Sequence, residues 1–118
     1  MNQDIINKFI EFAKNRKYIN RAWLYGSRIK GKHKPESDFD IAIEIKGNHT
    51  DETDFSFWFF NNEKLNKELK DFLGINAHLE HYKRGSHVKK FVDKDGILIY
   101  SRLAHKTYSG YYSLILDV

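Results

Sequence analysis

The sequence LYGSR at residues 24–28 ends one apolar run, and SDFDIAI at residues 37–43 opens the next, with ten residues between Ser27 and Asp38. Side chains two residues apart on a strand point to the same face, so Asp38 and Asp40 would form one pair of carboxylates. Paired carboxylates suit Mg²⁺ ions that carry a nucleoside triphosphate. The stretch therefore predicts phosphoryl or nucleotidyl transfer.

The turn before these carboxylates offers groups that bind phosphate. Gly26 has no Cβ and lets the backbone approach a phosphate closely, while the Ser27 hydroxyl and the turn N–H groups would bond its oxygens. Arg28 would pair with phosphate oxygens through two N–H groups. Ser37, just before the acidic pair, would either cap the start of the strand or join the nucleotide site.

Composition narrows the class of protein. The 118 residues fit one domain, and 41% hydrophobic residues, with nine Phe and seven Tyr, supply a packed core. We expect no membrane span, because no apolar run approaches 18 residues, and the N-terminus lacks the features of a signal peptide. The absence of cysteine excludes disulfides and thiolate metal sites and favours a cytoplasmic protein. The net charge of +4 is only weakly favourable to nucleic acid.

Hydrophobic periodicity predicts an α/β (α+β) domain with a mixed sheet flanked by helices. The expected helices and strands alternate as α-β-β-α-β-α-β over residues 4–17, 18–25, 39–45, 55–73, 75–82, 87–92 and 97–100. Phe39, Ile41, Ile43 and Ile45 would face the core. We assign residues 1–101 to this domain and residues 102–118 to a tail that would contact a partner or a second copy.

The pattern G-S-x10-D-x-D at Gly26, Ser27, Asp38 and Asp40 resembles the nucleotidyltransferase superfamily of the DNA polymerase β type. The short chain resembles the minimal nucleotidyltransferases that are the antitoxin halves of HEPN toxin–antitoxin pairs. The likeness covers about residues 18 to 101. It implies two Mg²⁺ ions as cofactors, ATP or another NTP as substrate, and transfer of an NMP, with AMP favoured, to a hydroxyl on a HEPN-type toxin.

The sequence departs from the family pattern at the third carboxylate, which active members carry on the next core strand. Alignment of the apolar neighbours places His78 at that position, and Glu80 lies two residues further on, on the same face. Either Glu80 replaces the missing acid, giving Asp38, Asp40 and Glu80 as catalytic metal ligands, or the site is incomplete. His78 and His81 are three apart, so they would point to opposite faces and could not share a zinc ion.

Two further interpretations compete with the enzyme. In the first, the metal site is impaired and the protein neutralises its partner by contact alone, through exposed aromatic side chains of residues 55–60 and the Tyr-rich tail. In the second, which the charge favours only weakly, the acceptor is tRNA or another RNA. Trp23 and a buried stripe of Trp58, Leu65, Leu69 and Phe72 are expected in the core. A homo-oligomer is compatible with the sequence.

Overall fold

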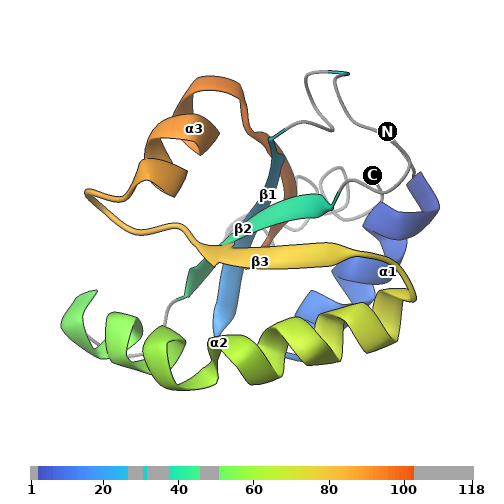
Figure 1. The fold of residues 1–118 in the computed structure, drawn as a ribbon, viewed down its shortest axis with the longest axis horizontal. Helices are drawn as coiled ribbons and strands as arrows, with labels where there is room; N and C mark the ends of the chain where they lie inside the picture. The colour runs from blue at the N-terminus through green and yellow to red at the C-terminus, as the bar shows by residue number, and fades with distance from the viewer. Residues whose placement is uncertain (1–2, 27–30, 32–37, 46–50, 103–118) are drawn as a thin grey trace.

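The computed structural model describes residues 3–26, 31, 38–45 and 51–102 and contains the predicted order of helices and strands (Figure 1). The elements are α1 (Gln3–Lys14), β1 (Ile19–Tyr25), β2 (Phe39–Ile45), α2 (Asp51–Leu73), β3 (Ala77–His81), α3 (His87–Asp95) and β4 (Ile97–Ser101). The sheet order is β3-β2-β1-β4, in which β2 and β3 are parallel and the other two pairs are antiparallel. The predicted mixed sheet is confirmed.

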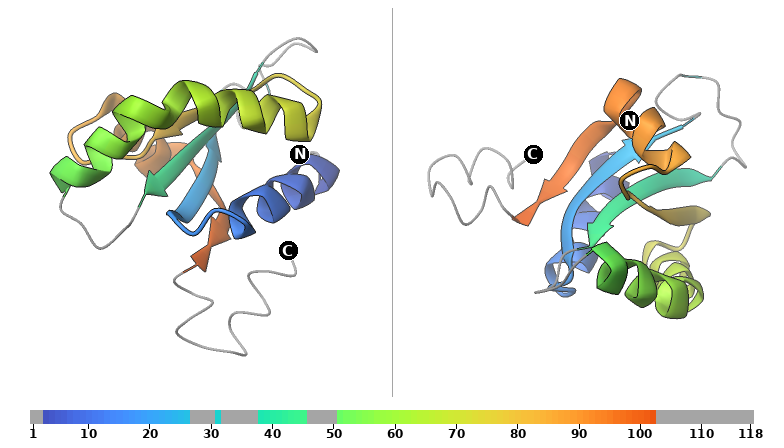
Figure 2. Two further views of the ribbon diagram at one scale, coloured as in Figure 1. Left: turned by 90° about the horizontal axis from the view of Figure 1, so that it is seen from below. Right: turned by 90° about the vertical axis from the view of Figure 1, so that its left-hand side faces the viewer.

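Helices cover both faces of the sheet (Figure 2). The face against α1 and α2 holds the main core, in which Phe9, Phe12, Ile41, Leu69 and Leu79 are almost completely buried. The opposite face, here called the α3 face, holds a smaller cluster of buried side chains beneath α3. The alternation on β2 explains the division, because its Ile side chains point to the main core while its acidic side chains point to the α3 face.

Most predicted boundaries lie within a few residues of the observed ones. Helix α2 ends where Gly74 was expected to end it: Gly74 has φ of +69° and donates its N–H to the Lys70 carbonyl at 2.8 Å. The same helix begins four residues earlier than predicted, at Asp51 rather than Phe55. Asp4, predicted as a cap, lies within the first turn of α1, where a negative charge favours the helix dipole.

Of the predicted core residues, Phe72 was assigned wrongly, and Trp23 packs against the smaller cluster rather than the main core. Phe72 is 49% exposed, since the stripe that faces the sheet follows Leu65, Leu69 and Leu73 at spacings of four residues. Trp23 is half-buried on the α3 face, where its ring stacks on Tyr82 with 4.2 Å between centroids. The reason is the strand period of two, which places Trp23 on the opposite side from Leu24.

Side-chain hydrogen bonds connect the end of β4 to α1 and satisfy backbone groups of the edge strand β3. The Arg102 guanidinium donates to the carbonyls of Ala13 at 3.0 Å and Ile19 at 3.2 Å, so the end of β4 is tied to the C-terminus of α1. At the edge strand β3, Asn66 accepts from the Leu79 N–H at 2.7 Å and donates to the Leu79 carbonyl at 3.4 Å. These bonds satisfy backbone groups that no strand among the described residues reaches.

Candidate functional site

The turn after β1 brings backbone directly against a carboxylate. Gly26 has φ of +87°, and a Cβ at this position would lie 2.5 Å from Oδ2 of Asp40. An L side chain would therefore meet both an unfavourable backbone conformation and a clash. Both the positive φ and the close approach to Asp40 favour glycine here, and the approach places the predicted turn beside the predicted carboxylate.

Asp38 and Asp40 lie at the start of β2 as predicted. Asp38 is exposed and Asp40 is half-buried, while the intervening Phe39 faces the main core. Burial raises the pKa of Asp40, and the negative charges of Asp38 and Glu80 raise it further, whereas His78 acts in the opposite direction. Burial is the main cause of the raised pKa, and a bound cation would also relieve the repulsion from Asp38 and Glu80.

Strand β3 places the residues expected at the position of the third carboxylate beside Asp40. His78 lies opposite Asp40 in the parallel register, and Glu80 lies opposite Ala42. Nε2 of His78 and Oε1 of Glu80 are 2.5 Å apart, so Glu80 is engaged with the imidazole. His81 points to the other face, where it is buried against the Trp58 ring at 5.8 Å between centroids. The two histidines therefore cannot share one zinc ion.

The carboxylates of the predicted metal site are not gathered into a closed set. In residues 3–26, 31, 38–45 and 51–102, no three His, Cys, Asp or Glu side chains converge closely enough to hold a metal ion. The donor chemistry nevertheless fits a hard cation, because Asp38, Asp40 and Glu80 supply only carboxylate oxygens and Asp40 feels both other charges. The ligand set stays a prediction.

The remaining predicted phosphate ligands fall outside this geometry. Ser27, Arg28 and Ser37 lie beyond the residues that the structure describes, as does the tail from residue 103 onward. Their roles stay predictions.

A second carboxylate on the α3 face of β2 has its own cation. Glu44 accepts two bonds from Arg21, at 2.8 Å from Nε and 2.7 Å from Nη2, and a third from Asn20 at 3.1 Å. Glu44 is thus neutralised within the sheet. Asp40, four residues earlier on the same strand, forms no ion pair within the described part of the chain.

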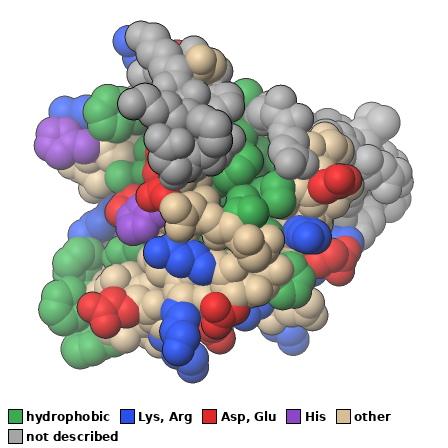
Figure 3. All heavy atoms as spheres, turned by 45° about the vertical axis from the view of Figure 1, so that its right-hand side comes forward, with side chains coloured by type: hydrophobic (Ala, Val, Ile, Leu, Met, Phe, Trp, Pro, Cys, Tyr) green, Lys and Arg blue, Asp and Glu red, His purple; other side chains and the backbone are tan. Residues whose placement is uncertain are grey.

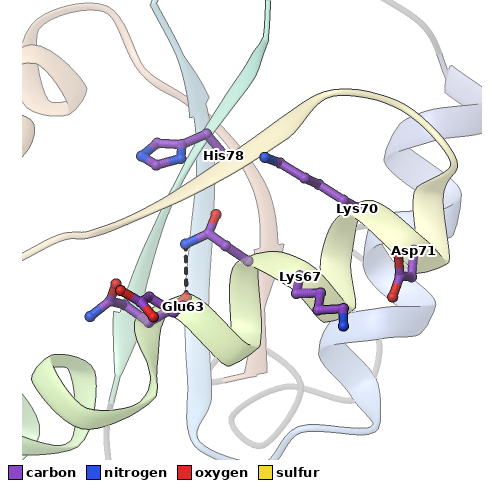
Figure 4. A pocket seen from close by; sticks show the side chains of 7 residues that line it. Glu63, Lys67, Lys70, Asp71 and His78 are labelled. Carbon is purple, nitrogen blue, oxygen red and sulfur yellow. Dashed lines mark hydrogen bonds between the residues drawn. The ribbon is translucent and has the colours of Figure 1, made fainter.

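A groove between α2 and β3 was not predicted from the sequence. It has a volume of about 420 Å³ and is lined by Asn62, Glu63, Asn66, Lys67, Lys70, Asp71 and His78. In Figure 4 the Lys70 side chain extends from α2 toward β3, the strand that carries His78. The polar spacing of Asn62, Asn66 and Lys70, four residues apart on one helix, is the signal that could have indicated this groove.

None of the helices in the described residues is long and apolar enough to cross a membrane. Residues 7–104 match the profile of the family described as Polymerase beta, Nucleotidyltransferase. A comparison with curated protein sequences finds no match.

The fold is similar to solved toxin–antitoxin structures. A complex with AMP-PNP has a TM-score of 0.63 at 18% identity, covering 95% of this chain and 84% of that chain. A structure of MntA–HepT has a TM-score of 0.59 at 17% identity, covering 98% and 85%. A complex of MNT antitoxin with tri-AMPylated HEPN toxin from Shewanella oneidensis has a TM-score of 0.60 at 18% identity, covering 99% and 85%.

Proposed function

Because this chain belongs to the polymerase β-type nucleotidyltransferase family, we propose that it transfers a nucleoside monophosphate from an NTP to a protein hydroxyl. The single observation that carries this proposal is the contact between Gly26 and Asp40. A backbone without a Cβ lies against a carboxylate whose pKa is raised by burial and by neighbouring acids. The reaction needs a phosphate-binding turn beside a metal ligand, and these are the roles that we propose for Gly26 and Asp40.

The predicted site residues would form two groups, one that binds the triphosphate and one that binds its Mg²⁺ ions. Gly26, with Ser27, Arg28 and Ser37, would hold the triphosphate. Asp38 and Asp40 would hold Mg²⁺, with Glu80 as the third ligand if it turns from His78. Bound Mg²⁺, as two ions, would stabilise the charge that develops on the α-phosphate and on the leaving group.

The transfer forms one bond and breaks one. The acceptor oxygen bonds to the α-phosphorus, the bond from that phosphorus to the bridging oxygen breaks, and pyrophosphate leaves with the electron pair. The proton of the hydroxyl passes through the neighbouring carboxylates to water. ATP is the substrate we favour, since a structure of similar fold was obtained with AMP-PNP.

A HEPN-type toxin is the partner we propose for this chain. The structures of similar fold include an MNT antitoxin in complex with a HEPN toxin that carries AMP groups. In this proposal, modification silences the toxin and the chain acts as its antitoxin.

Neutralisation by contact alone is the second candidate function. The observation in its favour is the engagement of Glu80 with His78, which leaves Asp38 and Asp40 as the acids free of that contact. In that case the nucleotidyltransferase fold would remain while transfer is lost.

Calorimetry with ATP, GTP, CTP and UTP in the presence of Mg²⁺ separates the two functions. The enzyme predicts metal-dependent binding of an NTP, and a loss of label transfer from [α-³²P]NTP on the order of a thousandfold or more in Asp40→Ala, because the metal contributes several kcal/mol. The matched control is Glu44→Gln, which removes a charge from the same face of the same strand. Absence of NTP binding by folded protein would overturn the enzyme and favour the contact-only function.

A further inference from the structure

One face of α2 flanks the edge strand β3 along its length. Phe59, Glu63, Asn66 and Lys70 follow spacings of four, three and four residues, which place them on one stripe of a helix. The stripe begins near the C-terminal end of β3, where the Lys83 ammonium lies 4.0 Å from the Phe55 ring centroid. It ends at the groove beside His78.

The N-terminal part of this face of α2 is aromatic and open to solvent. Phe55, Phe59 and Phe60 are 44%, 63% and 80% exposed. Phe59 packs against both neighbours, with ring centroids 6.4 Å from Phe55 and 5.2 Å from Phe60. Hydrophobic side chains accordingly gather over this end of α2, at the lower left of Figure 3. Exposed aromatic side chains in contact with one another are typical anchors of protein interfaces.

The C-terminal part of this face, which lines the groove, is polar, and its charges balance. Lys67 and Lys70 face the groove together with Glu63 and Asp71. Neither lysine forms an ion pair within the part of the chain that the structure describes, so their donors remain for a ligand. Two carboxylates would repel the backbone of a nucleic acid, whereas a polypeptide with charges of both signs matches this surface.

The groove reaches His78, the neighbour of Asp40 on the adjacent strand. His78 lines it, and the backbone of His78 lies opposite Asp40 in the parallel register of β2 and β3. A segment lying in the groove would therefore bring a side chain to the carboxylates from the side of β3. The Gly26 turn approaches Asp40 from the side of β1, the neighbouring strand across the sheet. Donor and acceptor would thus reach Asp40 from opposite sides.

We propose that this face of α2, from Phe55 to Asp71, is the docking surface for the acceptor protein. The aromatic group formed by Phe55, Phe59 and Phe60 anchors an apolar patch of the acceptor, and the polar groove holds the segment whose hydroxyl is modified. The inference rests on the proposed function and assigns the acceptor to the polypeptide class.

The first step of the test identifies the acceptor. The chain is incubated with Mg²⁺ and each [α-³²P]NTP in a soluble extract of the cells that make it, and the labelled species is characterised by protease and nuclease digestion. A labelled protein is then purified without its label and used as the acceptor in kinetic measurements. Labelled RNA would overturn the docking surface and the protein acceptor while leaving nucleotidyl transfer itself, and no label at all would overturn both proposals.

Matched variants then test the surface itself. Phe59→Ser/Phe60→Ser and Lys70→Glu are each expected to raise KM for the acceptor on the order of tenfold or more, with NTP affinity within twofold of the parent by calorimetry. The controls are Phe91→Ser, an exposed aromatic on α3 at 55%, and Lys94→Glu, also on α3. An unchanged KM in the α2 variants, with transfer intact, would overturn the docking surface alone.

Discussion

Asp40 and Glu44 lie on the same face of β2, but their carboxylates have different partners. Glu44 receives a guanidinium from Arg21 through two short bonds and an amide from Asn20. Asp40 has Asp38 and Glu80 for neighbours, and burial together with their charges raises its pKa. Strand β2 thus carries two carboxylates in different surroundings. The charge of Glu44 is neutralised by partners within the chain, whereas the charge of Asp40 is repelled by neighbouring acids.

The difference separates a structural acid from a candidate functional one. An acid that serves only the fold gains stability from a partner supplied by the chain. An acid that must bind a cation from solution is left without one, and the free protein loses some stability as a result. The following predictions test this division between the two ends of β2.

The largest effect is expected where backbone touches Asp40. Gly26→Ala should lower the free energy of unfolding by about 2 to 4 kcal/mol, from positive φ and from the clash with the carboxylate. It should also weaken binding of Mg²⁺ with NTP. Gly85→Ala is the control, since Gly85 has φ of +84° and nothing within 4 Å of its Cβ position. Denaturant unfolding of both variants measures the difference, and equal losses would contradict the role of the contact.

At the other end of β2, Glu44→Gln should cost about 1 to 3 kcal/mol of folding free energy, because Arg21 would lose its charged partner in a half-buried setting. Glu11→Gln is the comparison, as the Glu11–Lys14 pair is exposed at 3.6 Å and should contribute less than about 0.5 kcal/mol. Calorimetric NTP binding by Glu44→Gln should equal that of the parent. A loss of NTP binding would place Glu44 in the nucleotide site and contradict the distinction between Glu44 as a structural acid and Asp40 as a functional one.

The smallest effect is a gain in stability. A raised pKa means that folding favours protonated Asp40, so this contribution is present below the pKa of the unfolded chain and is lost as pH rises through the folded pKa. Without metal at pH 7, Asp40→Asn should therefore melt roughly 1 to 3 °C higher than the parent.

Thermal unfolding in EDTA, followed by circular dichroism, measures this shift. The gap should close at about pH 3, where the parent's Asp40 is protonated as well. A variant that melts lower than the parent at pH 7 would mean that Asp40 is a stabilising acid like Glu44.

Local patterns predicted most of this fold. The alternation of residues 39–45 gave the bounds of β2, and Gly74 gave the end of α2, because both signals depend only on neighbours in sequence. Phe72 was assigned wrongly to the buried stripe because the phase of a helix against a sheet is set by packing. In α2 that packing selects Leu73.

The candidate site was harder to predict from the sequence than the fold, because its contacts depend on the register in which β2 and β3 pair. Spacing placed Asp38, Asp40, His78 and Glu80 on matching faces, and the structure confirms that His78 and Glu80 share one. The bond between His78 and Glu80, and the placing of His78 opposite Asp40, require the pairing of β2 with β3. The groove beside α2 was likewise not predictable, because α2 and β3 form it together and no sequence pattern shows that they are adjacent.

The bonds of Asn66 to Leu79 have a consequence for how any partner meets this protein. The middle of an edge strand normally offers its backbone as a template for another strand, and sheets join or aggregate in this way. On β3 an amide side chain already occupies both groups of Leu79. Strand addition at Leu79 is therefore blocked, and recognition there would use side chains, whose specificity can change by substitution on α2 without altering the sheet.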